Sequence, residues 1–150
     1  MQPKTRWRPQ PTVGTGSATL RERFSLPPLK IPDPDWHALL TARPNMLLCG
    51  PQSATDAMLH ALEPHLTRPH CECRAGFLQL PLKGTVILRD VAALGIEEQG
   101  HLFQWLDQVS EPIQVVCSTA GELFSLVENG GFLAPLYYRL NVVRLDLPVV

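Results

Sequence analysis

The sequence lacks several features by which a class of protein is usually recognised. No apolar run approaches the roughly 18 residues of a membrane-spanning helix, and the N-terminus has no apolar stretch typical of a secretory signal. The net charge is only −1, so no overall positive field is available to hold nucleic acid. Four cysteines in 150 residues are too few for a disulfide framework. With 45% hydrophobic and 18% charged residues, the expected class is a globular protein of the cytoplasm.

Positive charge and proline are concentrated at the N-terminus. Residues 1–32 carry six Lys or Arg side chains against one acid, Glu22, a balance of +5, and six of the 15 prolines. Proline removes backbone donors and favours extended neighbours. We therefore predict that residues 1–32 form a mostly disordered basic arm, either a solubilising tail or a segment that contacts nucleic acid or an acidic partner. Residues 33–150 are predicted to form a single domain.

From residue 33 onward, short apolar runs alternate with helical patterns. The runs are bounded by turn residues and predict strands at 46–49, 84–88, 113–117 and 142–147. Helices are expected from Asp33 or Asp35 to Leu40, from residue 53 or 55 to 66, and over 97–109, 120–128 and 135–139, with a loop at 67–76. This alternation predicts an α/β fold, a three-layer sandwich with a mostly parallel sheet. Ligand sites in such sheets lie at the carboxyl ends of the strands.

The last segment, from Gly131 to Pro148, reads GFLAPLYYRLNVVRLDLP. It resembles the end of the core ATPase domain of sigma-54-dependent transcription activators, an AAA+ family, which reads roughly GRFREDLYYRLNVVRLRLP. Three further stretches resemble that family: the phosphate-loop region at 46–57, the Walker B strand and next helix at 84–108, and the first-sensor strand at 115–123. The resemblance implies a P-loop NTPase (AAA+) core. The chain stops at Val150, before the family's helical lid, and nothing resembling its GAFTGA loop occurs.

The phosphate-loop region has lost most of the residues that would bind ATP. Such a loop needs glycines that let backbone N–H groups close around phosphate, a lysine, and a hydroxyl for magnesium. Of these, Gly50 remains, whereas Thr55 replaces the second glycine, Asp56 stands at the lysine position and Ala57 at the hydroxyl position. At about 4 Å and an effective dielectric near 20, each pair of unit charges interacts by about 4 kcal/mol. Replacing the lysine by Asp56 therefore turns attraction for a triphosphate into repulsion.

The other nucleotide positions implied by the resemblance are also altered. Arg89 and Asp90 stand where the family has the acidic pair of Walker B. Ala120 stands where it has the sensor asparagine, and Leu133 where it has the first of two arginines. The vestigial nucleotide site thus comprises Gly50, Ser53, Thr55, Asp56, Arg89 and Asp90. Arg89 and Asp56 are predicted to pair across it. The family would use ATP and Mg²⁺, but we expect no cofactor and no catalysis.

The resemblance, together with these altered positions, implies a non-catalytic, AAA+-derived domain like the sigma-54 interaction domain, with a regulatory or interaction role in bacterial transcription or signalling. The expected partner is a protein, either an AAA+ activator or a second copy of the chain. The candidate contact surface comprises Phe132, Tyr137, Tyr138 and Arg139, of which Arg139 is interpreted as a surface or interface ion-pair residue. Two alternatives remain: a weak nucleotide-binding switch without hydrolysis, and binding of nucleic acid or an acidic partner through residues 1–32.

One cluster of soft ligands falls outside the family pattern. His70, Cys71 and Cys73 lie close together in the sequence. A zinc site typically uses Cys-x₂₋₄-Cys pairs, and Cys-x-Cys is tight for that purpose. We interpret the segment as a loop with two free thiols and predict no metal.

Overall fold

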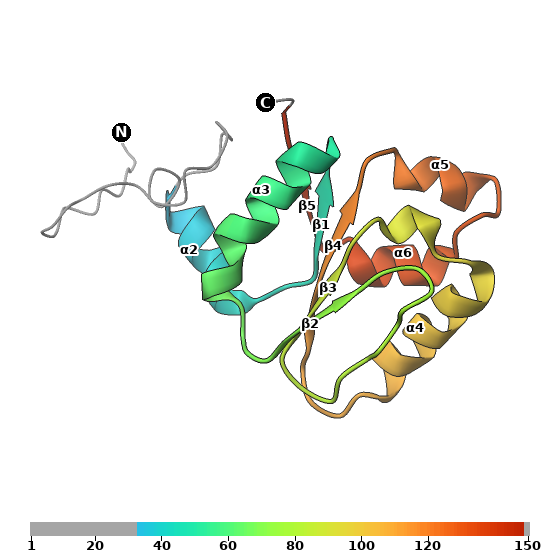
Figure 1. Ribbon diagram of the computed structural model, residues 1–150, viewed down its shortest axis with the longest axis horizontal. Coiled ribbons are helices and arrows are strands. Elements are labelled where there is room, and N and C mark those ends of the chain that lie inside the picture. The colour runs from blue at the N-terminus through green and yellow to red at the C-terminus, as the bar shows by residue number, and fades with distance from the viewer. Residues whose placement is uncertain (1–32, 149–150) are drawn as a thin grey trace, which may run out of the picture.

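The computed structural model describes residues 33–148, and the predicted arm at 1–32 lies outside the described residues. Helices and strands are interspersed along the described chain (Figure 1). The helices are α2 Asp33–Ala42, α3 Gln52–Leu62, α4 Ile96–Gln108, α5 Leu123–Glu128 and α6 Ala134–Leu140. The strands are β1 Met46–Cys49, β2 His70–Cys73, β3 Thr85–Leu88, β4 Gln114–Thr119 and β5 Val143–Asp146. Two 3₁₀ turns, η1 Glu63–His65 and η2 Val91–Ala93, follow α3 and β3.

The strands found within residues 33–148 form one sheet in the order β2-β3-β4-β1-β5. Every neighbouring pair is parallel. The predicted α/β class with a parallel sheet is therefore confirmed. In this register Cys49 lies opposite both Thr119 and Asp146, so the carboxyl ends of the central strands meet at one edge of the sheet.

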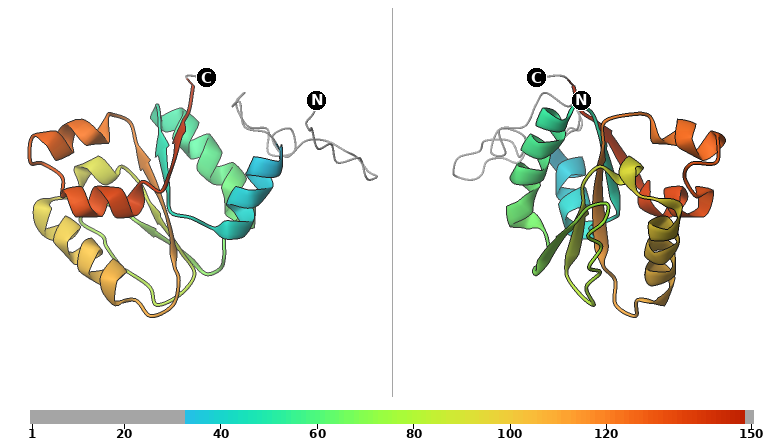
Figure 2. Two further views of the ribbon diagram at one scale, coloured as in Figure 1. Left: turned by 180° about the vertical axis from the view of Figure 1, so that it is seen from behind. Right: turned by 45° about the vertical axis from the view of Figure 1, so that its right-hand side comes forward.

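Helices cover both faces of the sheet, which completes the predicted three layers. Figure 2 shows α2 and α3 on one face and α4, α5 and α6 on the other. Along β1, Met46 and Leu48 pack in the core on the α3 side, whereas Leu47 packs in the core on the α4 side. Coverage on both sides explains why the central strands read as continuous apolar runs. None of the helices within residues 33–148 combines the length and the apolarity that a bilayer crossing demands.

The prediction of a loop at 67–76 was wrong. Residues His70–Cys73 form the edge strand β2, and the N–H groups of Thr85 and Arg89 donate to the carbonyls of Pro69 and Cys73 at 3.0 and 3.1 Å. Strand β2 pairs on one side only, with β3, and of its four residues only Cys73 is buried. Its sequence therefore lacks the apolar run by which the inner strands were found.

Candidate functional site

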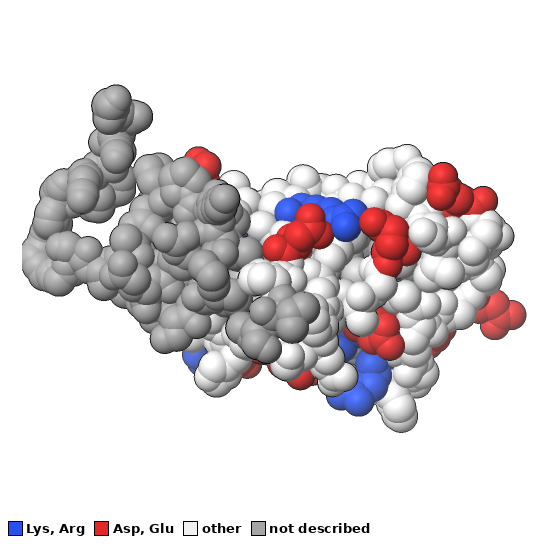
Figure 3. Space-filling model, turned by 90° about the horizontal axis from the view of Figure 1, so that it is seen from above, with Lys and Arg blue, Asp and Glu red and all other residues white. Residues whose placement is uncertain are grey.

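The predicted vestigial site lies at the carboxyl ends of the strands, around a cavity of about 380 Å³. Residues from four segments line it, including Gly50, Thr55, Asp56, Arg89, Asp90 and Ser118. Of the six residues assigned from the sequence, only Ser53 does not line it; its side chain is exposed. Viewed from above, Lys and Arg lie beside Asp and Glu, and no large area of one sign is visible (Figure 3).

The segment that would form a phosphate loop is helical instead. Helix α3 begins at Gln52, so only Gly50 and Pro51 separate it from β1. The N–H groups of Ala54 and Thr55 both donate to the carbonyl of Pro51, at 2.9 and 3.0 Å. The Thr55 hydroxyl donates to the carbonyl of Gln52 at 3.1 Å. These donors are used within the helix, whereas an anion-binding loop needs its N–H groups directed at the ligand.

Gly50 has a structural role that needs no phosphate. Its φ is +156°, and a Cβ at this position would lie 2.9 Å from the carbonyl oxygen of Leu147. Its N–H donates to the carbonyl of Thr119 at 3.0 Å. Gly50 therefore allows the chain to leave β1 in close contact with the last residue of β4, Thr119, and with Leu147, which follows β5.

Arg89 occupies the centre of a three-residue charge cluster. Its guanidinium pairs with Asp56, which confirms the ion pair predicted from the sequence, and also with Glu72. The hydrogen bond to Glu72, followed by the charges of Glu72 and Asp56, raises the pKa of Arg89 above its ordinary value. The Arg89 side chain is 32% exposed and both carboxylates 44%. At such exposure each pair adds at most about 1 kcal/mol to stability.

Glu72 was missed because residues 67–76 were expected to be a loop. Once His70–Cys73 is a strand beside β3, Glu72 lies opposite Ile87 and its side chain reaches the end of β3. The cluster then contains one cation and two carboxylates, a net charge of −1. The cavity itself is lined by Asp56 and Arg89 together with Asp90 and Arg74, so among the described residues its walls carry two carboxylates and two cations.

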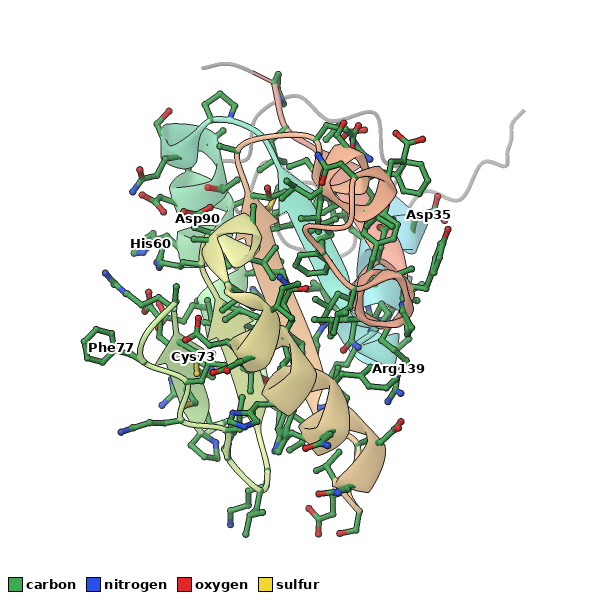
Figure 4. The ribbon with its side chains drawn as sticks, turned by 90° about the vertical axis from the view of Figure 1, so that its right-hand side faces the viewer. Asp35, His60, Cys73, Phe77, Asp90 and Arg139 are labelled. Carbon is green, nitrogen blue, oxygen red and sulfur yellow. The ribbon has the colours of Figure 1, made fainter. Side chains whose placement is uncertain are left out.

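Asp90 lies beside this cluster but does not join it. Its backbone adopts a left-handed conformation with φ of 52°, and its N–H donates to the Ser118 hydroxyl at 3.0 Å. Its carboxylate is exposed, and its hydrogen bonds within the described residues come from the backbone. Figure 4 shows Asp90 near the upper end of the molecule, above Cys73 and Phe77.

The predicted contact surface needs correction at two of its four residues. Phe132 and Tyr137 are 2% and 6% exposed and belong to the core, so they cannot contribute a binding surface in this conformation. Tyr138 is 63% exposed and packs edge-to-face on Tyr137, with ring centroids 5.2 Å apart. Helix α6 is buried on one face, so Tyr137 points into the core and the next residue, Tyr138, points to solvent.

Arg139 is a surface ion-pair residue, as predicted. It pairs with Asp107 at 2.6 Å, donates to the carbonyl of Leu106 at 3.0 Å and lies 5.8 Å from the ring centroid of Phe103. These contacts fix α6 against α4. The guanidinium of Arg139 is therefore held by contacts within this chain.

Gln99 is a buried polar residue that the sequence interpretation missed. It is 0% exposed, and its amide nitrogen donates to the carbonyls of Leu94 and Gly131 at 2.9 and 3.1 Å. Its amide oxygen accepts from the N–H of Leu133 at 2.8 Å. Gln99 lies three residues before the inward-facing Leu102, and this helical spacing could have predicted that Gln99 faces the core. Gln99 fixes the backbone at Leu133, where the family places its first arginine.

Comparisons with known proteins agree with this architecture. A family model described as the sigma-54 interaction domain matches residues 51–150. The HTH-type transcriptional regulatory protein TyrR of Salmonella typhimurium is 29% identical over 122 residues, which cover 72% of this chain and 22% of TyrR. The probable regulatory protein HrpR of the Pseudomonas syringae pathogenicity locus is 27% identical over 111 residues, covering 67% of this chain and 35% of HrpR. The chain thus spans about a fifth to a third of these relatives.

Solved structures share the fold at low identity. NtrX from Brucella abortus, crystallised in complex with ATP, superposes with a TM-score of 0.65 at 17% identity, covering 89% of this chain and 36% of NtrX. The P-loop NTPase domain of an Escherichia coli sigma-54 activator has a TM-score of 0.51 at 16% identity, covering 77% of this chain and 94% of that domain. The five-stranded sheet described here therefore has the fold of a P-loop NTPase core.

Proposed function

This chain belongs to the sigma-54 interaction domain family of transcription regulators, and we propose that within bacterial transcription regulation it acts by protein contact, without ATP hydrolysis. The observation that carries this proposal is the helical conformation of residues 52–56. An ATPase of this fold needs a loop of free N–H groups and a lysine at that point. Here the N–H groups of Ala54 and Thr55 bond within the helix, and Asp56 points a carboxylate at Arg89.

The Arg89 cluster supports the same conclusion from charge. Magnesium-dependent hydrolysis requires carboxylates that are free to hold the metal and orient water. Asp56 and Glu72 are instead paired with Arg89, whose own charge opposes a metal ion. In this proposal the pocket keeps the place of the family's site at the ends of the strands, while its central cation, Arg89, is held by two carboxylates of the same chain.

The proposed contact surface is the exposed part of α5 and α6. Phe124 and Tyr138 are 37% and 63% exposed, and both rings pack on the buried Tyr137. Aromatic side chains held on a buried neighbour make strong anchors in protein interfaces. We name a second AAA+ subunit, either an activator or another copy of this chain, as the partner.

Calorimetric titration with ATP or ADP, each with and without Mg²⁺, tests the absence of nucleotide chemistry. We expect no binding heat at millimolar nucleotide and no phosphate release. Saturable, magnesium-dependent binding in the micromolar range would overturn the proposal and favour a nucleotide-binding switch. Asp90→Asn would then show whether the remaining free carboxylate holds the metal.

Sedimentation analysis tests the contact surface, with the chain alone and mixed with a purified sigma-54 activator ATPase domain. Tyr138→Ala should weaken the association at least about tenfold, the effect of losing a central aromatic anchor. Phe77→Ala provides the control, because Phe77 is 72% exposed and lies on the connection between β2 and β3. Equal effects of the two substitutions, or no association at all, would refute the assigned surface.

A further inference from the structure

The two cysteines of β2 present their thiols on the same face. Residues i and i+2 of a strand point to the same side, and the sulfurs of Cys71 and Cys73 are 3.9 Å apart. Both thiols are directed at one acceptor, the backbone carbonyl of Gln79, at 2.9 and 3.5 Å. The strand, unforeseen from the sequence, thus creates a triangle of two sulfurs and one oxygen.

The dimensions of this triangle match those of a metal site. With Zn–S of about 2.3 Å and Zn–O of about 2.1 Å, a tetrahedral ion places two sulfurs about 3.8 Å apart and each sulfur about 3.6 Å from the oxygen. The observed separations are 3.9, 3.5 and 2.9 Å, so only the distance from Cys71 to the carbonyl must lengthen. We propose that Cys71, Cys73 and the Gln79 carbonyl bind a thiophilic divalent cation of the zinc class. This site is independent of the proposed transcriptional role.

Binding would exchange protons for metal without any redox step. Each thiol releases one proton to solvent, two metal–sulfur bonds form, and the carbonyl oxygen completes three ligands. Within residues 33–148 no group of three or more His, Cys, Asp or Glu side chains could hold a metal. The described residues thus offer two side-chain ligands and one carbonyl, and the fourth position is left to water or an added ligand. With two thiolates, the affinity should be lower than that of a four-cysteine structural site.

The segment that supplies the carbonyl is already held in place. The N–H of Gly76 donates to Glu98 at 2.6 Å, and the indole N–H of Trp105 donates to the carbonyl of Pro81 at 3.0 Å. Cys71 is half-buried and gives an ion access, whereas Cys73 is 1% exposed. Figure 4 shows Cys73 beside this segment and the Phe77 ring projecting away from it. A bound ion would fasten the segment that bears Phe77 to β2.

Titration of the reduced, tag-free chain tests the site. Zn²⁺ is measured by competition with a chromophoric chelator, and Cd²⁺ by its ultraviolet thiolate charge-transfer band. We expect one equivalent of each ion, and at least a tenfold loss of affinity in Cys71→Ser. Cys49→Ser, at the other partly buried cysteine, should bind as the wild type does.

A second variant tests the contribution of the other thiol to metal binding. Cys73→Ser should also abolish the charge-transfer band, and circular dichroism reports whether it remains folded. If it unfolds, Cys71→Ser alone decides, because its side chain is partly exposed. Absence of wild-type binding, undiminished binding by Cys71→Ser, or a loss caused by Cys49→Ser would overturn the proposal.

Discussion

Gln99 offers the most direct test of how the core is held together. Gln99→Met keeps the length of the side chain and suits a helix, but removes three hydrogen bonds to Leu94, Gly131 and Leu133. At about 1 kcal/mol net for each bond, the loss is about 3 kcal/mol, and more if a partner stays buried without water. That is a large part of the 5–15 kcal/mol typical of a whole domain.

Urea unfolding at 25 °C measures this loss directly. With a slope of about 2 kcal/mol per molar urea, the midpoint should fall by about 1.5 M while the slope stays constant. Gln104→Met is the matched control, because Gln104 lies on the same helix and is exposed; its effect should stay within about 0.5 kcal/mol. A loss below about 1 kcal/mol in Gln99→Met would refute the assigned role.

Two further predictions concern stability. Gly84→Ala should cost more than about 2 kcal/mol or prevent folding, because φ is +98° and the new Cβ would lie 2.1 Å from the Pro69 carbonyl; Gly95→Ala, with open space around it, is the control for a thermal melt. Burial raises the pKa of the Cys117 thiol above its ordinary 9.0. Because the pKa of the Cys117 thiol is higher in the folded than in the unfolded chain, its contribution to the free energy of unfolding is complete below pH 9.0. Above pH 9.0 this contribution declines, because the thiol ionises in the unfolded chain. Urea midpoints should therefore fall above pH 9.0, less steeply in Cys117→Ala, and equal slopes would contradict this assignment.

The sequence predicted the parts of the fold whose signal is local. The inner strands are buried on both faces and so carry apolar runs, and the Arg89–Asp56 pair followed from the family positions of two opposite charges. Of the two edge strands, β2 has one buried residue and carried no apolar run, and Glu72 was missed with it. Phe132 was assigned to the contact surface although it is buried, because the residue type alone does not show whether an aromatic side chain lies in an interface or in the core.

The two ends of the resemblance have different physical meanings. In the segment after Gly131, the matching residues Phe132, Tyr137 and Leu140 are all buried, so the core requires them whether or not a nucleotide binds. In the segment after Gly50, the family's glycine, lysine and hydroxyl serve a phosphate, and those are the positions that differ, as Thr55, Asp56 and Ala57. Gly50 itself matches, and it is the position where a Cβ would meet the Leu147 carbonyl. Tyr138 and Val142 also match the family although they are 63% and 60% exposed, so packing accounts for only part of the match after Gly131. The sequence match by itself gives no support for ATP hydrolysis.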